Sequence, residues 1–179
     1  MATPSTSVSQ AASSDSYLQI DGVPGEATND KHKDWIELIS LSHEITQPVS
    51  STRGSAGGGP SGRSQHGDLI VNLYVDKSYP KLCEAVSNGK AFAKAKIEVC
   101  RAGGSQVVFL VIAMEEVVIS KVVLSPPTAA ANKDGDVLPT ATAYLNYGKI
   151  EWTYTQQKRK DGSGGGNVTA KYDVTAGKS

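Results

Sequence analysis

The sequence is poor in several residue types that would mark particular functions. Its 179 residues include only two cysteines, two methionines, two phenylalanines and two tryptophans, and the longest unbroken apolar run, residues 107–114, is eight residues long. A membrane-spanning helix needs about 20 apolar residues, so we expect no membrane insertion. A surplus of charge is also missing, because 18 basic residues balance 18 acidic ones. Without a concentrated basic surface to neutralise phosphates, the sequence predicts no nucleic-acid binding.

The first residues lack the features of an export signal. Residues 1–16 contain no Lys or Arg and no apolar run, so they do not meet the requirements of a secretory signal peptide, and we expect a disordered leader. A chain made in the cytosol stays in a reducing compartment. We therefore expect Cys83 and Cys100 to be free, mostly buried thiols.

What the sequence has in quantity favours β-structure. It contains 18 Gly, 17 Val, 12 Thr and 9 Ile, and β-branched residues pack well on pleated sheets. Glu115 and Glu116 interrupt an apolar stretch and are expected to close a hairpin. Alternating apolar and polar residues predict strands at 17–23, 35–45, 68–76, 93–100, 106–114, 117–124, 141–157 and 168–174.

One segment has helical rather than strand spacing. Asp76 or Ser78 can cap its start, Leu82 and Ala85 fall on one face, and Gly89 is placed to end it. Seven or eight strands with a single short α-helix packed beside them predict a mainly β protein, an antiparallel β-barrel or sandwich. We assign residues 17–176 to a single domain.

A long Gly/Ser-rich loop divides the strands. Between Gln47 and Gly67, 13 of 21 residues are Gly, Pro or Ser, and a loop of this length inside a compact domain is usually functional or disordered. Residues 57–62 match G-x-G-x-x-G by letters. A dinucleotide-binding loop must open a helix, whereas a strand is expected here, so the match does not support nucleotide binding.

No catalytic, metal or cofactor motif is recognisable. His32, His43 and His66 do not have the spacing of a zinc site. Glu115 and Glu116 are adjacent on an extended chain, so their side chains point to opposite faces and cannot work as an acid and base pair. We therefore expect no enzymatic activity, no metal and no cofactor.

Several ordered blocks carry a family resemblance. They are YLQIDGVPGE at 17–26, KHKDWIEL at 31–38, DLIV at 68–71, KLCEA at 81–85, IEVCRAGG at 97–104, LNYGKIEWTY at 145–154 and AKYDV at 170–174. Together these blocks resemble the haemolysin-coregulated protein (Hcp) family, the tube protein of bacterial type VI secretion. The resemblance extends over residues 17–176, and the order of the blocks makes it more specific than any one of them.

The resemblance has consequences for fold and function. It implies a β-barrel of two sheets with one helix, assembled as a homohexamer whose rings stack into tubes. It implies a contractile sheath around the tube, a spike protein at its tip and effector cargo in its lumen. It further implies a cytoplasmic protein that is secreted through the type VI system without a cleavable signal peptide, and no enzymatic activity.

Candidate contacts between subunits follow from the loops and strands. We expect the 47–67 loop to project and touch the next ring, and the strands at 35–45 and 106–114 to supply lateral contacts. That the lateral positions are simply barrel core is an equal alternative, because the sequence does not show which parity faces inward. The candidate contact residues are Gln47, Pro48, Arg53, Pro60, Arg63 and His66 in the loop, Trp35, Glu37, Ile39, Val108 and Leu110 in the strands, and Lys158 and Arg159 in a basic cluster.

Two other classes of function compete with the tube subunit. A small β-barrel can bind a ligand or peptide as a monomer or dimer. A hydrolase with an unrecognised site is a third, weaker hypothesis. The oligomeric state distinguishes the ligand-binding barrel from the ring. A cluster of titratable groups in a pocket would support the hydrolase.

Overall fold

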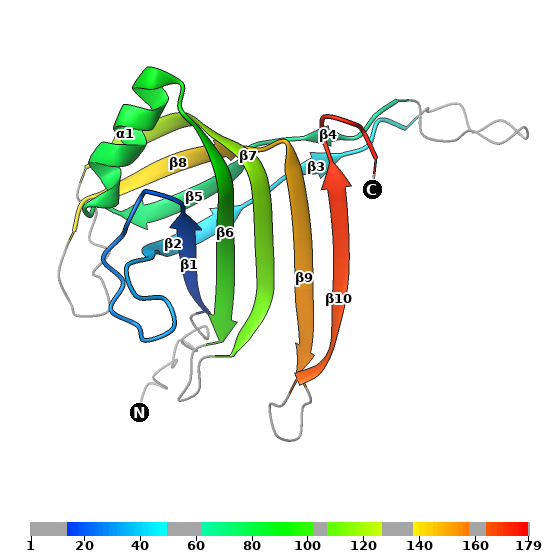
Figure 1. Cartoon of the computed structure of the whole chain (residues 1–179), viewed down its shortest axis with the longest axis horizontal. Helices are drawn as coiled ribbons and strands as arrows, with labels where there is room; N and C mark the ends of the chain where they lie inside the picture. Colours follow the sequence, from blue (N-terminus) through cyan, green and yellow to red (C-terminus); the bar gives the residue numbers. More distant parts are fainter. Residues whose placement is uncertain (1–13, 50–61, 102–106, 127–137, 158–163, 179) are drawn as a thin grey trace, which may run out of the picture.

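The computed structural model of the chain consists mainly of strands, with one helix packed beside them (Figure 1), as predicted. It describes residues 14–49, 62–101, 107–126, 138–157 and 164–178. The elements are β1 (Ser14–Ile20), β2 (Ile36–Ser42), β3 (Ile45–Thr46), β4 (Gln65–His66), β5 (Leu69–Tyr74), α1 (Ser78–Asn88), β6 (Ala91–Arg101), β7 (Val108–Ser125), β8 (Thr140–Asn146), β9 (Lys149–Gln157) and β10 (Gly164–Asp173).

Six strands close into a barrel. The main sheet has the order β10-β9-β7-β6-β1-β2-β5-β8, and β8 pairs again with β7, so the strands from β7 to β8 form a ring. All of these pairings are antiparallel. The remaining strands, β9 and β10, continue the sheet from β7 beyond the barrel (Figure 1). The predicted antiparallel barrel is therefore confirmed, with an extension of the sheet that the sequence did not reveal.

The expected hairpin at Glu115 and Glu116 is wrong. β7 runs without interruption through both residues, and Glu116 takes a left-handed conformation with φ 56°. Before this point β7 pairs with β9, and after it β7 pairs with β8. A local change of backbone direction thus lets one long strand serve both the barrel and the sheet extension, where the charge pair had indicated a chain reversal.

The predicted long strand at 141–157 is in fact two strands. The chain turns at Tyr147 and Gly148, which separate β8 from β9. The Gly148 N–H donates to the carbonyl of Glu115 at 3.0 Å, and the Glu116 side chain occupies the space that a Cβ at Gly148 would need. The turn therefore lies against the bend in β7. The wrongly predicted hairpin at Glu115 and Glu116 and the wrongly predicted single strand at 141–157 thus concern the same place in the fold.

The helix ends where the sequence predicts, but its N-cap position is Lys77, which makes no side-chain capping bond, rather than the predicted Asp76 or Ser78. The Asp76 carboxylate accepts the Ser78 N–H at 2.8 Å, and Gly89 ends α1 in a left-handed conformation with φ 62°. Leu82 and Ala85 are buried, and α1 packs against β7. The helix covers one end of the barrel (Figure 1).

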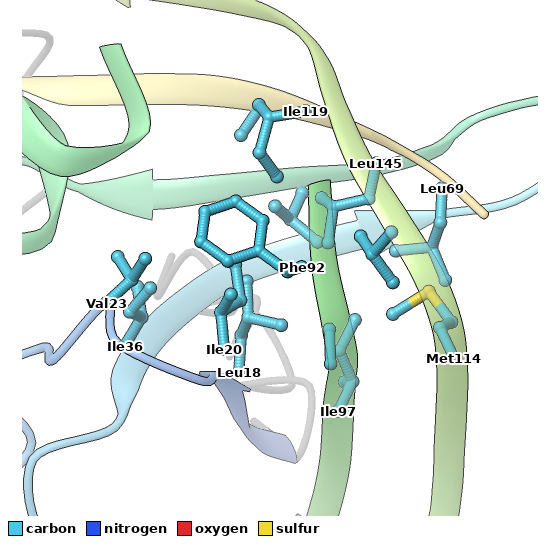
Figure 2. Close-up of a cluster of buried hydrophobic side chains, with 14 of the residues drawn as sticks. Leu18, Ile20, Val23, Ile36, Leu69, Phe92, Ile97, Met114, Ile119 and Leu145 are labelled. Carbon is cyan, nitrogen blue, oxygen red and sulfur yellow. The ribbon is translucent and has the colours of Figure 1, made fainter. Parts of the chain in front are cut away.

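The barrel interior is filled by apolar side chains. Figure 2 shows part of this core, including Leu18, Leu69, Ile97, Met114 and Leu145, which come from five different strands. All six barrel strands contribute buried residues to the same cluster. A six-stranded barrel has a narrow interior that side chains readily fill. The interior of the barrel is thus occupied by the chain's own side chains.

A second, smaller cluster lies outside the barrel. Tyr17 and Cys100 are buried there, with Trp35 and Val108 packed partly against them. Cys100 is thus a buried free thiol, and Cys83 is a half-buried one, which confirms two free cysteines. The first strand, β1, begins at Ser14, inside the predicted leader, and pairs with β6 from that residue onward. The rest of the leader, residues 1–13, lies outside the described residues.

Candidate assembly surfaces

The long loop leaves the barrel on a short ladder. β3 and β4 pair with Ile45 opposite His66, and the Gly67 N–H donates to the carbonyl of Glu44 at 2.9 Å. These strands prolong the β2–β5 pair beyond the barrel (Figure 1). We call residues 45–66 the arm. Its described parts are the base, 45–49 and 62–66.

Predicted contact residues of the arm hold its base together. The Gln47 side chain donates to the carbonyl of Gly62 at 2.7 Å and so joins the two chains of the arm above the ladder. Pro48 is half-buried beside it. The Arg63 guanidinium lies against Gly177 of the C-terminal turn. The other two predicted arm contacts, Arg53 and Pro60, lie outside the described residues.

Two exposed apolar residues of the arm escaped the sequence analysis. Ile45 is 46% exposed and Val49 is 69% exposed. Ile45 closed the predicted strand at 35–45, and Val49 lay in the predicted 47–67 loop, but neither was selected as a contact residue. Burial of apolar side chains away from water lowers the free energy. The exposed Ile45 and Val49 therefore make the base of the arm suitable for contact with another molecule.

The arm is fixed to the barrel by a histidine–tyrosine cluster, which we define as His43, His66 and Tyr147. His43 Nε2 lies 2.7 Å from the Tyr147 hydroxyl, and His66 Nδ1 lies 2.9 Å from the same oxygen. The His66 ring stacks on Tyr172 with centroids 4.7 Å apart, and Trp152 lies beside both imidazoles. His66, predicted as a contact to another ring, thus contacts β10 of its own chain.

The cluster favours neutral side chains. Burial lowers the pKa of His43, and the neighbouring His66 lowers it further. Burial also lowers the pKa of His66. Burial and the Asp68 carboxylate raise the pKa of the Tyr147 hydroxyl. All three groups are therefore uncharged at neutral pH.

The sheet extension exposes an apolar row. Leu110, Tyr154 and Val168 lie side by side on β7, β9 and β10, and we call them the apolar strip. Tyr154 is 45% exposed and Val168 is 68% exposed. Residues of the same parity further along these strands, such as Met114 and Ile150, are buried in the core. The strip is thus the core-facing side of the sheet, continued past the point where the barrel covers it.

The predicted lateral residues fall in different environments. Leu110 belongs to the apolar strip, and Ile39 is 40% exposed at an irregularity in the β2–β5 pairing. Trp35 and Val108 pack within the second cluster of the same chain. Glu37 is half-buried and pairs with Tyr17 across β1 and β2. The remaining candidates, Lys158 and Arg159, lie outside the described residues.

Sequence reasoning did not select Tyr154 or Val168 as contacts. Both lie in stretches predicted as strands, and the alternation there is ordinary. The sequence did hold a signal for these contacts, because Tyr154 and Val168 are apolar residues near strand ends, where solvent-exposed strands usually carry polar residues. Only the pairing of β9 and β10 outside the barrel shows that nothing else in the described chain covers these side chains.

The opposite face of the extension is polar and carries a shallow cleft. The cleft has a volume of 440 Å³. Hydrogen bonding to Glu116 raises the pKa of Lys149 at its edge. Acidic and basic side chains are present in equal number around it, so it has no preference for an ion of either sign. The charged residues that line it are Glu115, Lys149, Glu151, Lys171, Asp173 and Lys178.

The described residues assemble neither a metal centre nor a membrane span. Across 14–49, 62–101, 107–126, 138–157 and 164–178, no group of three His, Cys, Asp or Glu side chains converges as metal ligands. In this part of the chain α1 has 11 residues, and no helix there is long and apolar enough to cross a bilayer.

The fold presents a packed barrel, a projecting arm base and an exposed apolar strip, which are features typical of proteins that associate through their surfaces. Residues 17–154 match the family described as "Type VI secretion system effector, Hcp". Protein hcp1 of Pseudomonas aeruginosa is 31% identical to the chain, over 89% of this chain and 94% of that protein.

Solved structures give the same result. A structure described as that of a type six secretion system protein aligns with a TM-score of 0.83 and 26% identity, over 93% of this chain and 99% of the other. Hcp1 from Salmonella typhimurium aligns with a TM-score of 0.71 and 27% identity, over 92% and 97% of the two chains. The chain belongs to the Hcp family, and it is a structural subunit of the type VI secretion tube.

Proposed function

We propose that this chain forms hexameric rings that stack into a tube, with lateral contacts through the apolar strip and axial contacts through the arm. The observation that carries the proposal is the apolar strip itself. Its side chains continue the core face of a sheet into solvent, and a neighbouring subunit would cover them. A protein that remained a monomer would gain nothing from leaving this face exposed.

The position of β2 favours a head-to-tail ring. Around the six-stranded barrel, β2 is three strands away from β7 in either direction. The strip and the exposed Ile39 therefore lie on opposite sides of the barrel. Different patches on opposite sides form heterologous contacts, which close into a ring when the rotation permits. Ile39 and Glu37 of one copy are our candidates to face the strip of the next.

The edge of the sheet extension adds a second source of lateral binding. β10 pairs with β9 on one side and is the last strand of the sheet on the other. An edge strand offers backbone N–H and C=O groups that another chain can pair with. The strip supplies apolar area beside this edge, so one neighbour could use both.

The arm is our candidate for stacking. Its base projects beyond the barrel and carries the exposed Ile45 and Val49. The predicted arm contacts Arg53 and Pro60, and the basic residues Lys158 and Arg159, remain part of this proposal. Local charges of this kind make stacking sensitive to salt.

The remaining partners follow from family membership. We propose that a contractile sheath surrounds the tube, that a spike protein caps it and that effectors travel in its lumen. On this proposal the chain is made in the cytoplasm and leaves through the type VI machine without a cleavable signal peptide. It acts as a structural element in this process rather than as an enzyme.

Substitution of Val168 tests the lateral contact. Val168→Lys places a charge in the apolar strip, and we expect native mass spectrometry to show monomers in place of hexamers. Because Val168 is 68% exposed in the single chain, the stability of the monomer should change by no more than about 0.5 kcal/mol. Thr169→Lys is the matched control, since Thr169 is adjacent but faces the other side of β10.

Three outcomes would count against this contact. Hexamers of Val168→Lys at the wild-type concentration would remove the strip from the interface. Monomers of the wild-type protein at micromolar concentration would contradict the ring itself. Monomers from both variants would place the contact on the edge of β10 rather than on the strip.

A further inference from the structure

One hydroxyl in the histidine–tyrosine cluster is shared by two imidazoles. Tyr147 is 5% exposed, and its oxygen lies within hydrogen-bond distance of His43 Nε2 and of His66 Nδ1. The two histidines belong to the two chains of the hairpin that becomes the arm, whereas Tyr147 belongs to the turn between β8 and β9. These two hydrogen bonds therefore join both chains of the arm to the barrel through a single atom.

The protons of the cluster can be assigned when both imidazoles are neutral. The Gly67 backbone raises the pKa of His43, which is the effect of a carbonyl that accepts an imidazole N–H. Because Nε2 faces the Tyr147 hydroxyl, we assign this N–H to Nδ1, and Nε2 then accepts from the hydroxyl. The hydroxyl oxygen in turn accepts from His66 Nδ1–H. Each proton has an acceptor in this arrangement.

Protonation breaks the arrangement. An imidazolium at His43 turns Nε2 into a donor, so both histidines would donate to the Tyr147 oxygen and the hydroxyl proton would lose its acceptor. An unpaired polar group in a buried site costs about 1–3 kcal/mol. A second proton on His66 would add repulsion, since the two ring centroids are 6.3 Å apart.

We propose that His43, His66 and Tyr147 form an acid-sensitive joint, which holds the base of the arm on the barrel while both imidazoles are neutral and weakens as they take up protons. The consequence for ring stacking rests on the proposed function, whereas the joint itself is a property of the single chain. The partner of the arm base in this joint is the turn between β8 and β9, together with Tyr172 of β10.

In the described part of the chain, neither imidazole forms an ion pair with a carboxylate. On β10 and β9, Tyr172 and Trp152 face the cluster, and their charged sequence neighbours alternate to the opposite face. The Asp68 carboxylate, which precedes β5, raises the pKa of Tyr147 and accepts a hydrogen bond from the Asn146 side chain at 2.8 Å. Arg63 is cationic and lies against the C-terminal turn. These charged neighbours therefore leave the neutral imidazoles favoured.

The direction of the pH effect follows from these surroundings. The pKa of each imidazole is lower in the docked arm than in a solvent-exposed chain, where it is about 6.5. The docked state is therefore fully favoured above about pH 6.5 and weakens as the pH falls toward the docked pKa. One pH unit below the ordinary value, each histidine that must stay neutral weakens docking by up to about tenfold.

Hydrogen exchange of the full chain tests the joint. Protection factors, corrected for the intrinsic rate, should fall several-fold for the amides of 45–49 and 62–67 between pH 7.5 and pH 5.5, while those of α1 stay constant. The double variant His43→Gln, His66→Asn can retain both hydrogen bonds without titrating in this range. Its arm should be equally protected at both pH values.

Each outcome bears on one proposal. Constant protection of the wild-type arm between the two pH values would overturn the joint, and so would an unchanged pH response in the double variant. Sedimentation of stacked rings at the same two pH values addresses stacking separately. If the arm loses protection at pH 5.5 while stacks persist, the joint holds and the axial role of the arm is wrong.

Discussion

Gly25 shows how a single residue sets the path of the chain before β2. Its N–H donates to the carbonyl of Asp34 at 2.8 Å, and a Cβ placed on it would lie 2.6 Å from the Cα of Ile36. The contacting atoms belong to the backbone of a strand, so they cannot move aside without disturbing β2. The turn signal Pro-Gly in the sequence thus reflects a close approach of two backbone segments as well as a turn.

We predict that Gly25→Ala destabilises the fold by about 2–3 kcal/mol, because overpacking against backbone has few routes of relief. Gly22→Ala is the comparison, since Gly22 has open space around it and only its φ of 80° disfavours a side chain. That change should cost about 1 kcal/mol. Urea unfolding measures both. A cost at Gly25 no larger than that at Gly22 would contradict the close-approach explanation.

His32 is a second residue whose role depends on its contacts. It is fully buried between the stacked ring of Tyr17 and the edge of Trp35. Its Nε2 lies 2.9 Å from a carboxylate oxygen of Glu98, and its Nδ1 lies 3.1 Å from Asn29 Oδ1. These contacts attach the segment before β2 to the outer face of β6. Their role is structural, because they hold this segment against the barrel.

At the scale of the element, the bend in β7 decides the architecture. The strand pairs with β9 before Glu116 and with β8 after it, so its change of direction separates the sheet extension from the barrel. Glu116 adopts a left-handed conformation without being a glycine. Such a conformation costs about 1–2 kcal/mol for an ordinary residue and more for a β-branched one.

We predict that Glu116→Val destabilises the protein by about 1–2 kcal/mol, because a β-branched side chain fits a φ of 56° poorly. The matched control is Glu115→Val, which removes a carboxylate of the same neighbourhood from a position with ordinary strand geometry. This control should stay within about 0.5 kcal/mol of wild type. Thermal unfolding followed by circular dichroism distinguishes them, and equal effects would show that the bend tolerates any residue.

At the scale of the whole molecule, the net charge of zero bears on how copies of the chain associate. A formal net charge of zero removes the repulsion that identical copies would otherwise feel at close range. Association then depends on local surfaces, of which the apolar strip and the arm are the two that project from the barrel. The absence of surplus charge, which first argued against nucleic-acid binding, is also what stacking of identical rings requires.

Shortening the arm tests the axial contact. Replacing residues 50–61 by Asn-Gly should leave the ladder of β3 and β4 in place, since this pair supports tight hairpin turns. We expect hexameric rings by native mass spectrometry but no sedimenting stacks. A comparable shortening of 127–137 should leave stacking unchanged. Tubes that persist in the first variant would assign stacking to another surface.

The sequence by itself determined the local features and the class of fold. Strand alternation and helix spacing are short-range patterns, so a mainly β chain with one helix followed directly from them. The cap at Gly89 was equally predictable, because a cap depends only on its neighbours in the chain. The ordered sequence blocks identified the Hcp family for the same reason, since they record residues in order along the chain.

Only the tertiary structure decided which surfaces are free and which side chains meet. Alternation has a period of two and does not state which parity faces the core, so the apolar strip was invisible until β9 and β10 were placed outside the barrel. His43 is 104 residues from Tyr147, and His66 is 81 residues from it. No local pattern links positions so far apart. Their meeting at one hydroxyl follows from the closure of the barrel, which brings the arm base and the β8–β9 turn together.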